Sequence, residues 1–270
     1  MIVTADDFGR SSEINAAVIA AYQSGVLTGA SLMVSGNAAD EAVALALEHP
    51  GLKVGLHLVL IDGVSVLPRT EIPELVDDDR RFSTDPAAGG TRYFFSAGAR
   101  RQLQQEARAQ VEKFKSFGLD MDHLNSHHHL HIHPTIAGIV VDLAREYHIP
   151  AIRCPFQGLR MVTRSTAAMA AVMFPWVMNL KLKLAVAGIA HNREVFGLYE
   201  NDAMNVDTWL RLIPELEPGI TEIFSHPAMP SSVQSGHDPS VIEYEALVSP
   251  KVREALHHEN VVLGSFSDFV

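Results

Sequence analysis

Short apolar runs alternate with longer segments of helical character along the chain, and this alternation constrains the fold more than any other feature. Repeated β–α units predict a parallel sheet whose strands are joined by helices. We expect strands at residues 2–4, 30–34, 54–60, 122–126, 151–154, 194–197, 220–225 and 261–264. We expect helices at 12–24, 38–48, 97–117, 134–147 and 206–216, with another ending near His257.

Seven or eight such units within 270 residues favour an α/β fold in one domain, residues 1–270. The prediction is a closed or distorted (β/α) barrel of seven or eight parallel strands, with an open doubly wound sheet as the alternative. No glycine fingerprint follows the first run, so a dinucleotide site has no support. The long stretch 61–96 holds three prolines and a charged run at 77–81. We expect it to form a lid over one end of the barrel.

Charge and cysteine content exclude several classes of protein. Asp and Glu number 32 and Lys and Arg number 21, so the net charge is −11. This balance argues against binding to nucleic acid and disfavours electrostatic docking on anionic lipid. One cysteine, Cys154, excludes an internal disulfide framework and a thiolate zinc cluster. The N-terminal residues lack the basic and apolar regions of a signal peptide, so we expect a cytoplasmic protein.

The most apolar stretch is 167–190, which Pro175, Asn179, Lys181 and Lys183 interrupt. These interruptions argue against a membrane-spanning helix. We expect a buried helix whose lysine side chains reach solvent, or a homodimer contact. A face for peripheral membrane contact or for an apolar substrate is the alternative.

Histidine is the unusual residue in the composition, because six of the 14 histidines fall within residues 123–133. In parallel α/β folds the active site lies at the C-terminal ends of the strands. Polar residues stand at the ends of several expected strands, so we expect acids, histidines and one arginine to meet at one rim. These residues are Asp6, Asp7, His57, His127, Arg153 and His226.

A divalent metal ion fits that set of side chains. Imidazole and carboxylate ligands together suit zinc, manganese, iron or cobalt, and three protein ligands leave a position open for catalysis. Such an ion would lower the pKa of a water molecule and polarise a substrate carbonyl. Of the adjacent Asp6 and Asp7, one could bind the ion while the other takes a proton from the water.

Each of these residues also has a purely structural interpretation. Asp6 and Asp7 could cap the next helix, His57 could be a core histidine, His226 a loop residue, and 127–133 a surface cluster. Two other functions also remain open. One is a barrel metallohydrolase of the amidohydrolase or phosphoesterase type, although such enzymes usually carry His-x-His where this chain has Asp-Asp. The other is a non-enzymatic, histidine-rich metal-binding protein.

Four motifs in this order resemble the signatures of the YdjC/ChbG-like carbohydrate deacetylases. They are Thr-Ala-Asp-Asp-Phe-Gly at 4–9, Gly-Leu-His-Leu at 55–58, Ser-His-His-His-Leu-His at 126–131 and Ser-His-Pro at 225–227. The resemblance spans nearly the whole chain. It implies a distorted barrel and a metal-dependent hydrolase that removes the N-acetyl group of an amino sugar.

By position, the resemblance implies that Asp7, His57 and His127 hold one divalent metal ion, Mg or Zn. Asp6 would be the general base, by analogy with other polysaccharide deacetylases, and the opposite division between Asp6 and Asp7 is the alternative. The Arg-Cys-Pro-Phe sequence at 153–156 is similar to a motif that orients this base, so Arg153 would pair with Asp6. The remaining catalytic residue would be His226, which protonates the leaving amine.

The chain departs from the family pattern at Asn125, where carbohydrate-specific members often have Asp. An amide cannot supply that negative charge, so metal affinity or substrate range would differ. Asn125, His129 and His131 are expected to contact substrate or to support the ligands. Segments 195–198 and 221–227 are most similar to the hopanoid-biosynthesis-associated (HpnK-like) branch, which implies an acetylated aminosugar head group on a lipid.

Overall fold

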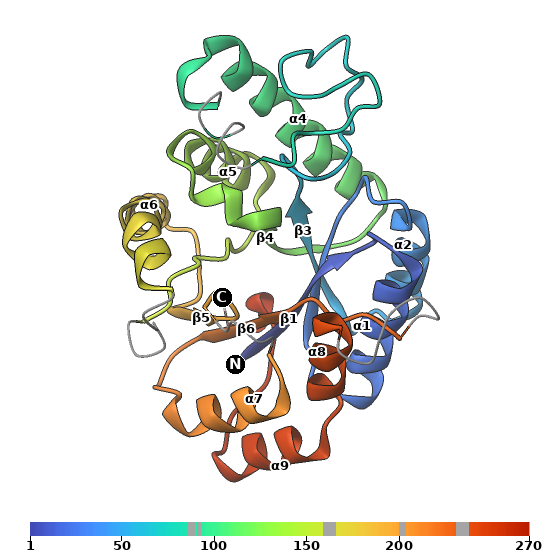
Figure 1. Ribbon diagram of the computed structural model, residues 1–270, viewed down its shortest axis with the longest axis vertical. Helices are drawn as coiled ribbons and strands as arrows, with labels where there is room; N and C mark the ends of the chain where they lie inside the picture. Colours follow the sequence, from blue (N-terminus) through green and yellow to red (C-terminus); the bar gives the residue numbers. More distant parts are fainter. Residues whose placement is uncertain (86–89, 91–92, 159–165, 200–203, 231–237, 270) are drawn as a thin grey trace.

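Six parallel strands form one curled sheet in the order β4-β3-β2-β1-β6-β5 (Figure 1). The computed structural model describes residues 1–85, 90, 93–158, 166–199, 204–230 and 238–269. The strands are β1 (Ile2–Phe8), β2 (Gly29–Leu32), β3 (Lys53–Leu58), β4 (Met121–Ser126), β5 (Glu194–Phe196) and β6 (Thr221–Ser225). The α/β class with a parallel sheet is therefore as expected.

Helices follow most of the strands and cover the sheet. They are α1 (Ser12–Ser24), α2 (Ala39–Glu48), α4 (Ala97–Ser116), α5 (Pro134–Tyr147), α6 (Ala167–Ala187), α7 (Val206–Leu212), α8 (Pro239–Leu247) and α9 (Pro250–His258). Short 3₁₀ helices are η1 (His127–Ile132), η3 (Ile213–Glu215) and η4 (Phe266–Asp268). The sequence did not predict α8, and the helix expected at 206–216 ends early, with η3 as its last turn.

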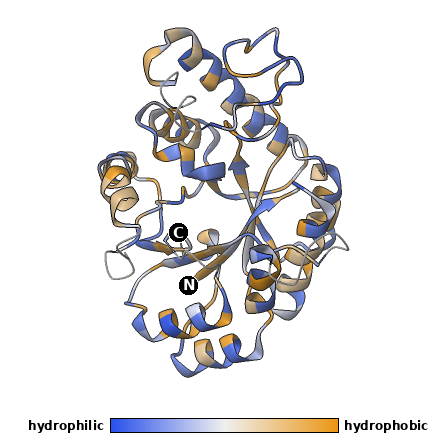
Figure 2. Cartoon of the chain, in the orientation of Figure 1, coloured by the Kyte–Doolittle hydropathy of each residue, from blue (hydrophilic) through white to orange (hydrophobic). Residues whose placement is uncertain are grey.

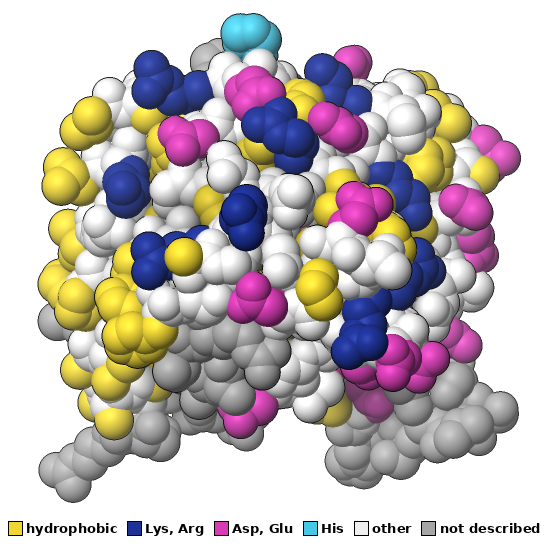
Figure 3. Space-filling view, turned by 90° about the horizontal axis from the view of Figure 1, so that it is seen from above, with side chains coloured by type: hydrophobic (Ala, Val, Ile, Leu, Met, Phe, Trp, Pro, Cys, Tyr) yellow, Lys and Arg dark blue, Asp and Glu magenta, His cyan; other side chains and the backbone are white. Residues whose placement is uncertain are grey.

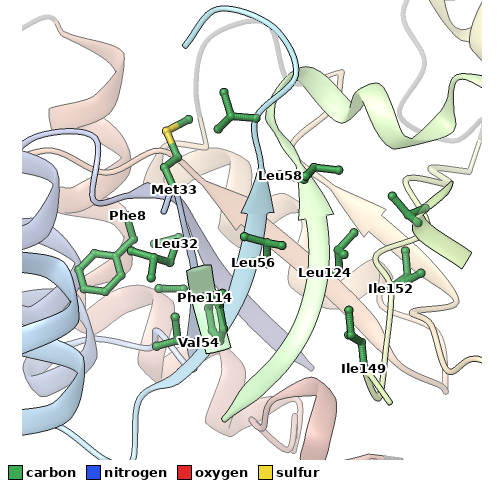
Figure 4. Close-up of a cluster of buried hydrophobic side chains, with 14 of the residues drawn as sticks. Phe8, Leu32, Met33, Val54, Leu56, Leu58, Phe114, Leu124, Ile149 and Ile152 are labelled. Carbon is green, nitrogen blue, oxygen red and sulfur yellow. The ribbon is translucent and has the colours of Figure 1, made fainter. Parts of the chain in front are cut away.

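The core lies between the sheet and these helices, and the strands carry its most apolar residues (Figure 2). Figure 4 shows Leu56 of β3 beside Leu124 of β4, with Phe114 of α4 packed against the same sheet. Burying each such side chain contributes about 1.5–3 kcal/mol to stability. The strands also carry a few buried polar residues, such as Thr4, Ser31 and Glu222, and the pocket forms at the strand ends.

The sheet has six strands within the described residues, so the expectation of seven or eight is wrong. Segment 151–154 makes only isolated bridges: Ile152 pairs with Leu124 of β4, and Ala151 pairs with Ala190 before β5. Pro155 follows this segment and has no N–H to donate, which interrupts a regular ladder, although Phe156 beyond it still accepts a hydrogen bond from Val195 N–H of β5 at 2.9 Å. The bridges nevertheless span the space between the two edge strands and extend the curl of the sheet.

Segment 261–264, the other expected strand, does not join the sheet. Its Gly264 N–H donates to the Met1 carbonyl at 3.0 Å, and the Met1 amino group donates to the Val262 carbonyl. Val261 N–H closes the end of α9 by bonding to the Leu256 carbonyl. Its backbone hydrogen bonds reach Met1 and Leu256, so the segment ties the two ends of the chain together without forming a ladder.

The long segment 61–96 packs against α4 through buried polar contacts. The Glu106 carboxylate accepts hydrogen bonds from the N–H groups of Val66 and Leu67 at 2.8 and 2.9 Å. Ile72 and Phe82 are buried in the core, so this part is an ordered extension of the domain. Residues 86–89 and 91–92 lie outside the described residues, and a role as a lid stays a prediction.

Helix α6 has an apolar composition but little burial. Within the described residues it alone is long and apolar enough to cross a membrane by length and composition, and 22% of its most apolar stretch is buried. The expectation of a buried helix is therefore wrong for most of its surface. Hydrophobic side chains gather along the left margin in Figure 3, the side on which α6 lies in Figure 1. The large exposed ones on α6 are Met169, Val172, Phe174, Trp176, Met178, Leu182 and Val186.

Candidate active site

Four segments that are distant in the sequence meet in one pocket at the C-terminal edge of the sheet. Asp6 and Asp7 come from β1, His57 from β3, His127 from the start of η1, and His226 from the residue after β6. Part of the pocket lining is apolar. It is formed by Met169, Met173, Gly197, Leu198 and Phe224.

A bulge at the end of β1 separates the two adjacent carboxylates. Between Ala5 and Phe8, β1 contains one residue more than the paired stretch of β2. Asp7 adopts a left-handed backbone with φ 64°, and His128 and His129 do the same with φ 53° and 52°. Such a conformation costs a non-glycine residue about 1–3 kcal/mol, and strain of this kind often marks functional sites. The bulge turns Asp7 toward the histidines while Asp6 faces Arg153.

Asp7, His57 and His127 form a compact triangle of ligand-type atoms. Asp7 Oδ1 lies 3.2 Å from His57 Nε2 and 3.0 Å from His127 Nδ1, and the two nitrogens are 3.4 Å apart. Atoms bonded to one ion at about 2.0–2.2 Å lie roughly 3.0–3.5 Å from one another. Asp7 Oδ1 and His127 Nε2 are buried without a hydrogen-bond partner among the described residues. The donor set and its spacing therefore fit a divalent metal ion.

A second group lies at the mouth of the same pocket. Asp62 Oδ2 is 3.6 Å from His127 Nε2 and 3.5 Å from His128 Nε2. Arg10 pairs with Asp7 Oδ2 at 2.8 Å and also approaches Asp62. Asp62 and His128 are far more exposed than the first triangle, so the inner group is the better candidate for tight metal binding.

Arg153 holds Asp6 in a buried network. Its guanidinium donates to both Asp6 oxygens at 2.6 and 3.0 Å, and its Nε and Nη2 donate to Glu222 at 3.0 and 2.7 Å. Thr4 donates to the same Glu222 oxygen, and the Phe224 ring lies 4.7 Å from the guanidinium carbon. Burial alone would raise the pKa of Asp6, but the Arg153 charge and hydrogen bonds outweigh it and lower that pKa well below its usual range.

The ligand triangle perturbs its own members in different directions. Burial opposes charge on Asp7, but the adjoining His127 and His57 rings lower its pKa well below the usual range. His57 is also buried, yet the Asp6 and Asp7 carboxylates raise its pKa. Burial lowers the pKa of His127 despite its contact with Asp7. Such a set of mutually perturbed groups in a pocket is typical of a functional site.

His129 and His131 point inward from the histidine run, but only one of them lines the pocket. His129 lies edge-on to Phe224, and burial lowers its pKa well below the usual range. His131 bonds to Ser126 Oγ at 2.7 Å and to the Arg153 carbonyl at 3.0 Å. Burial lowers the pKa of His131 to about 3. His131 therefore joins η1 to the strand-end segment that carries Arg153.

His226, the residue after β6, also lines the pocket. Its side chain is 46% exposed, and its ring packs edge-on against Phe224. Its backbone N–H donates to Glu243 of α8, and Nδ1 lies 4.0 Å from the same carboxylate. The pocket thus brings a solvent-accessible imidazole together with the Asp6 and Asp7 carboxylates.

The sequence reasoning did not identify Glu222 and Asp62, which both contact expected site residues. Glu222 could have been found, because a glutamate inside an otherwise apolar strand must have a buried partner. Asp62 had no such signal, since it follows a strand in a long segment with many acids. Asn125 lies between Asp6 and His57, with hydrogen bonds of 3.1 and 2.7 Å to them.

Fold and site together define an α/β protein with a candidate metal-binding pocket at the C-terminal edge of a curled parallel sheet. The chain belongs to the YdjC-like family, whose model matches residues 1–258. It is 31% identical over 279 residues to a carbohydrate deacetylase of Brevibacillus brevis, covering 99% of this chain and 98% of that protein. It is 32% identical over 274 residues to a carbohydrate deacetylase of Geobacillus stearothermophilus, covering 99% and 97%.

The fold also matches a crystal structure. That protein, from Enterococcus faecalis V583, is provisionally named for cellobiose-phosphate cleavage. The TM-score is 0.79 at 26% sequence identity, with 100% of this chain and 98% of that chain covered. The resemblance to the YdjC family that the four motifs indicated is thus confirmed over nearly the full length.

Proposed function

We propose that this protein is a metal-dependent hydrolase that removes the N-acetyl group from an amino sugar. The names of its full-length relatives support the reaction class. The observation that carries the proposal is the division of the Asp6–Asp7 pair, because one carboxylate meets two imidazoles while the other is held by a buried arginine. Amide hydrolysis needs both an activated water and a base, which a divided pair can supply.

Asp7, His57 and His127 would hold the metal ion. Two imidazoles with one carboxylate suit zinc, and magnesium, which prefers oxygen ligands, is the second choice. When bound, such an ion supplies a water of lowered pKa and a positive charge that polarises the acetamide carbonyl. An acetamide group would occupy the pocket beside the triangle, which His226 also lines.

Asp6 would act as the base. Its low pKa keeps it ionised at physiological pH, so it is always ready to accept a proton, although this also makes it a weak base. Arg153 fixes both of its oxygens and so determines its orientation. The opposite division of roles has less support, because Asp6 makes no contact with His127 comparable to that of Asp7.

His226 would give a proton to the leaving amine. Its imidazole is exposed, so solvent reaches the ring directly. His129, which also lines the pocket, would contact the sugar. His131 would support Arg153 from behind through its bond to the Arg153 carbonyl.

We also propose that the amino sugar is the head group of a lipid, as in the hopanoid-associated branch of the family. The apolar pocket wall supports this, because Met169 and Met173 belong to the same α6 that exposes large apolar side chains outside. Helix α6 carries Lys181 and Lys183 and no acidic residue, so it can lie on the surface of a cytoplasmic membrane. A homodimer through this face is the alternative, and light scattering with and without vesicles distinguishes the two.

Metal storage is the weaker candidate. A storage site needs several free imidazoles at the surface. In His131 and His123, however, both ring nitrogens are hydrogen-bonded to other protein groups. One tightly held ion per chain is therefore expected, in place of several ions.

The test is an acetate-release assay with defined metals. Purified protein is stripped of metal, reloaded with Zn²⁺ or Mg²⁺, and given either chitin oligosaccharides or N-acetylglucosaminyl lipids. Release of one acetate per turnover, faster from the lipid, supports the proposal. Absence of acetate release with every metal and both substrates would refute it, and equal rates on both substrates would refute the lipid assignment.

A further inference from the structure

A continuous chain of buried hydrogen bonds runs beneath the pocket from His57 to Asp122. His57 Nδ1 bonds to Asn125 Oδ1 at 2.7 Å, and Asn125 Nδ2 bonds to Ser31 Oγ at 2.8 Å. Ser31 Oγ bonds to His123 Nε2 at 2.9 Å, and His123 Nδ1 bonds to Asp122 Oδ2 at 2.9 Å. All five side chains are at most 4% exposed.

This chain crosses three neighbouring strands, which is feasible only because of a glycine. His123 on β4 reaches over β3 to Ser31 on β2, and Gly55 of β3 lies directly opposite Ser31 in the parallel register. A Cβ atom at Gly55 would lie 2.5 Å from the His123 ring. The glycine of the Gly-Leu-His-Leu motif therefore provides the space in which the imidazole sits.

The hydrogen bonds nearest the site fix the direction of the protons. Asp6 is ionised by Arg153 and can only accept, so Asn125 must turn its amide nitrogen toward Asp6, 3.1 Å away. Its amide oxygen then faces His57 Nδ1, which must donate. The Nε2 atom of His57 consequently carries the lone pair, and this atom faces Asp7 Oδ1 and His127 Nδ1.

The outer hydrogen bonds agree with this direction. The second Asn125 N–H donates to Ser31, so the Ser31 hydroxyl is left to donate to His123 Nε2. His123 Nδ1–H then donates to the Asp122 carboxylate, which can only accept. Each donor is used once and no two donors face each other.

We propose that Ser31, His123 and Asp122 form a positioning relay that holds Asn125, and that Asn125 sets His57 in the tautomer whose Nε2 is free to bind a metal ion. The inference rests on the proposed function in taking His57 as a ligand. Residues that orient a metal-binding histidine in this way typically change metal affinity about 10- to 100-fold when removed.

The far end of the relay is anchored by the C-terminal segment. Ser267 N–H donates to Asp122 Oδ1 at 2.9 Å, and the Phe266 ring lies 4.8 Å from the His123 ring. Asp122 thus accepts at both oxygens and cannot rotate away. The relay therefore extends the support of the ligand triangle from the pocket to η4.

Two small substitutions interrupt the relay without touching a ligand. Ser31→Ala removes the central hydroxyl, and Gly55→Ala fills the space of the His123 ring. We expect each to raise the Zn²⁺ dissociation constant on the order of 10-fold in titrations against a competing chelator. Both substitutions break the hydrogen bond between Ser31 and His123. The double variant should therefore bind Zn²⁺ no more weakly than the weaker-binding single variant, whereas two independent losses of affinity would multiply.

The second measurement follows the His57 ring nitrogens by ¹⁵N NMR in the metal-free protein at alkaline pH, where imidazole is neutral. The wild type should show the proton on Nδ1 only. In Ser31→Ala and Gly55→Ala, a fraction of His57 should carry its proton on Nε2, and in Asn125→Leu this fraction should be larger. A role in folding alone would not move this signal.

Matched controls are Ser65→Ala, a buried hydroxyl outside the relay, and Gly138→Ala, where nothing lies within 4 Å of the added methyl. Both should keep wild-type metal affinity and a single tautomer. Wild-type values of both quantities in Ser31→Ala and Gly55→Ala would overturn the relay. If the wild type binds no metal, the proposed function fails, and the tautomer signal still decides the relay.

Discussion

Beneath the candidate active site, charged and polar side chains are buried, whereas on the outer face of α6 large apolar side chains are exposed. Asp6, Arg153 and Glu222 are at most 1% exposed, while Val186 of α6 is 82% exposed. The buried charges are compensated by one another through short hydrogen bonds. On the outer face of α6, by contrast, the large apolar side chains remain in contact with solvent.

The difference separates two kinds of functional signal. Buried charges are stable where an opposite charge holds them, as Arg153 holds Asp6 and Glu222. Asp7 Oδ1, by contrast, has no hydrogen-bond partner within the described residues and would gain a partner from a metal ion. A large exposed apolar surface describes a contact that the chain does not complete. The buried network beneath the pocket therefore indicates a catalytic site, and the exposed face of α6 indicates a surface that binds something outside the chain.

Breaking the buried network should have the largest effect. Arg153→Leu leaves Asp6 and Glu222 buried without their common cation, which we expect to lower the free energy of unfolding by about 3–5 kcal/mol. The measurement is chemical denaturation followed by circular dichroism. Arg193→Leu is the matched control, because Arg193 pairs with Glu217 at the surface and its loss should change the free energy of unfolding by less than ~1 kcal/mol. Equal losses in the two variants would contradict the comparison.

A second effect, spread over several pH units, should appear through His131. Its folded-state pKa is about 3, below the ordinary value of 6.5, so the unfolded chain binds the proton more readily. The stability that this neutral ring provides is complete above pH 6.5 and is lost as pH falls toward 3, at about 1 kcal/mol per pH unit. Denaturation curves of the wild type and His131→Asn at several pH values measure it. If the free energies of unfolding of both proteins fall in parallel over this range, His131 is not the cause.

The smallest effect on stability should come from the outer face of α6. Leu182→Ser should change the free energy of unfolding by no more than about 0.5 kcal/mol, since that side chain is 64% exposed. Leu184→Ala, on the buried face two residues away, should cost about 2–5 kcal/mol. Leu182→Ser should, however, weaken sedimentation with lipid vesicles, and Leu184→Ala should not if it remains folded. A large loss of stability in Leu182→Ser would show that this face is packed.

Many helices and strands were predictable because the residues that start and end them are local in the sequence. The helices Ser12–Ser24 and Pro134–Tyr147 have the expected bounds, since a capping serine and an N-terminal proline define their starts. Segment 151–154 has the apolar composition of a strand but forms only bridges, because membership of a sheet depends on partners that local sequence does not specify. The expectation of seven or eight strands therefore exceeded the six observed.

The candidate site was predictable where a strand-end position and a residue type coincide. The strand ends bring together Asp7, His57 and His127, as expected for polar residues at the C-terminal edge of a parallel sheet. The separation of Asp6 from Asp7 was not predictable from spacing, because it depends on the β1 bulge and on the left-handed backbone of Asp7. The role of Gly55 was equally hidden, since it depends on a histidine two strands from Ser31.

The division of labour between Asp6 and Asp7 is the central claim, and Zn²⁺ titration of two isosteric variants, with acetate release measured on the same samples, tests it most directly. Asp6→Asn should bind one ion per chain with near wild-type affinity and release no acetate. Asp7→Asn should lose tight binding of the ion together with activity. Tight binding by Asp7→Asn, or loss of the ion from Asp6→Asn, would contradict the account.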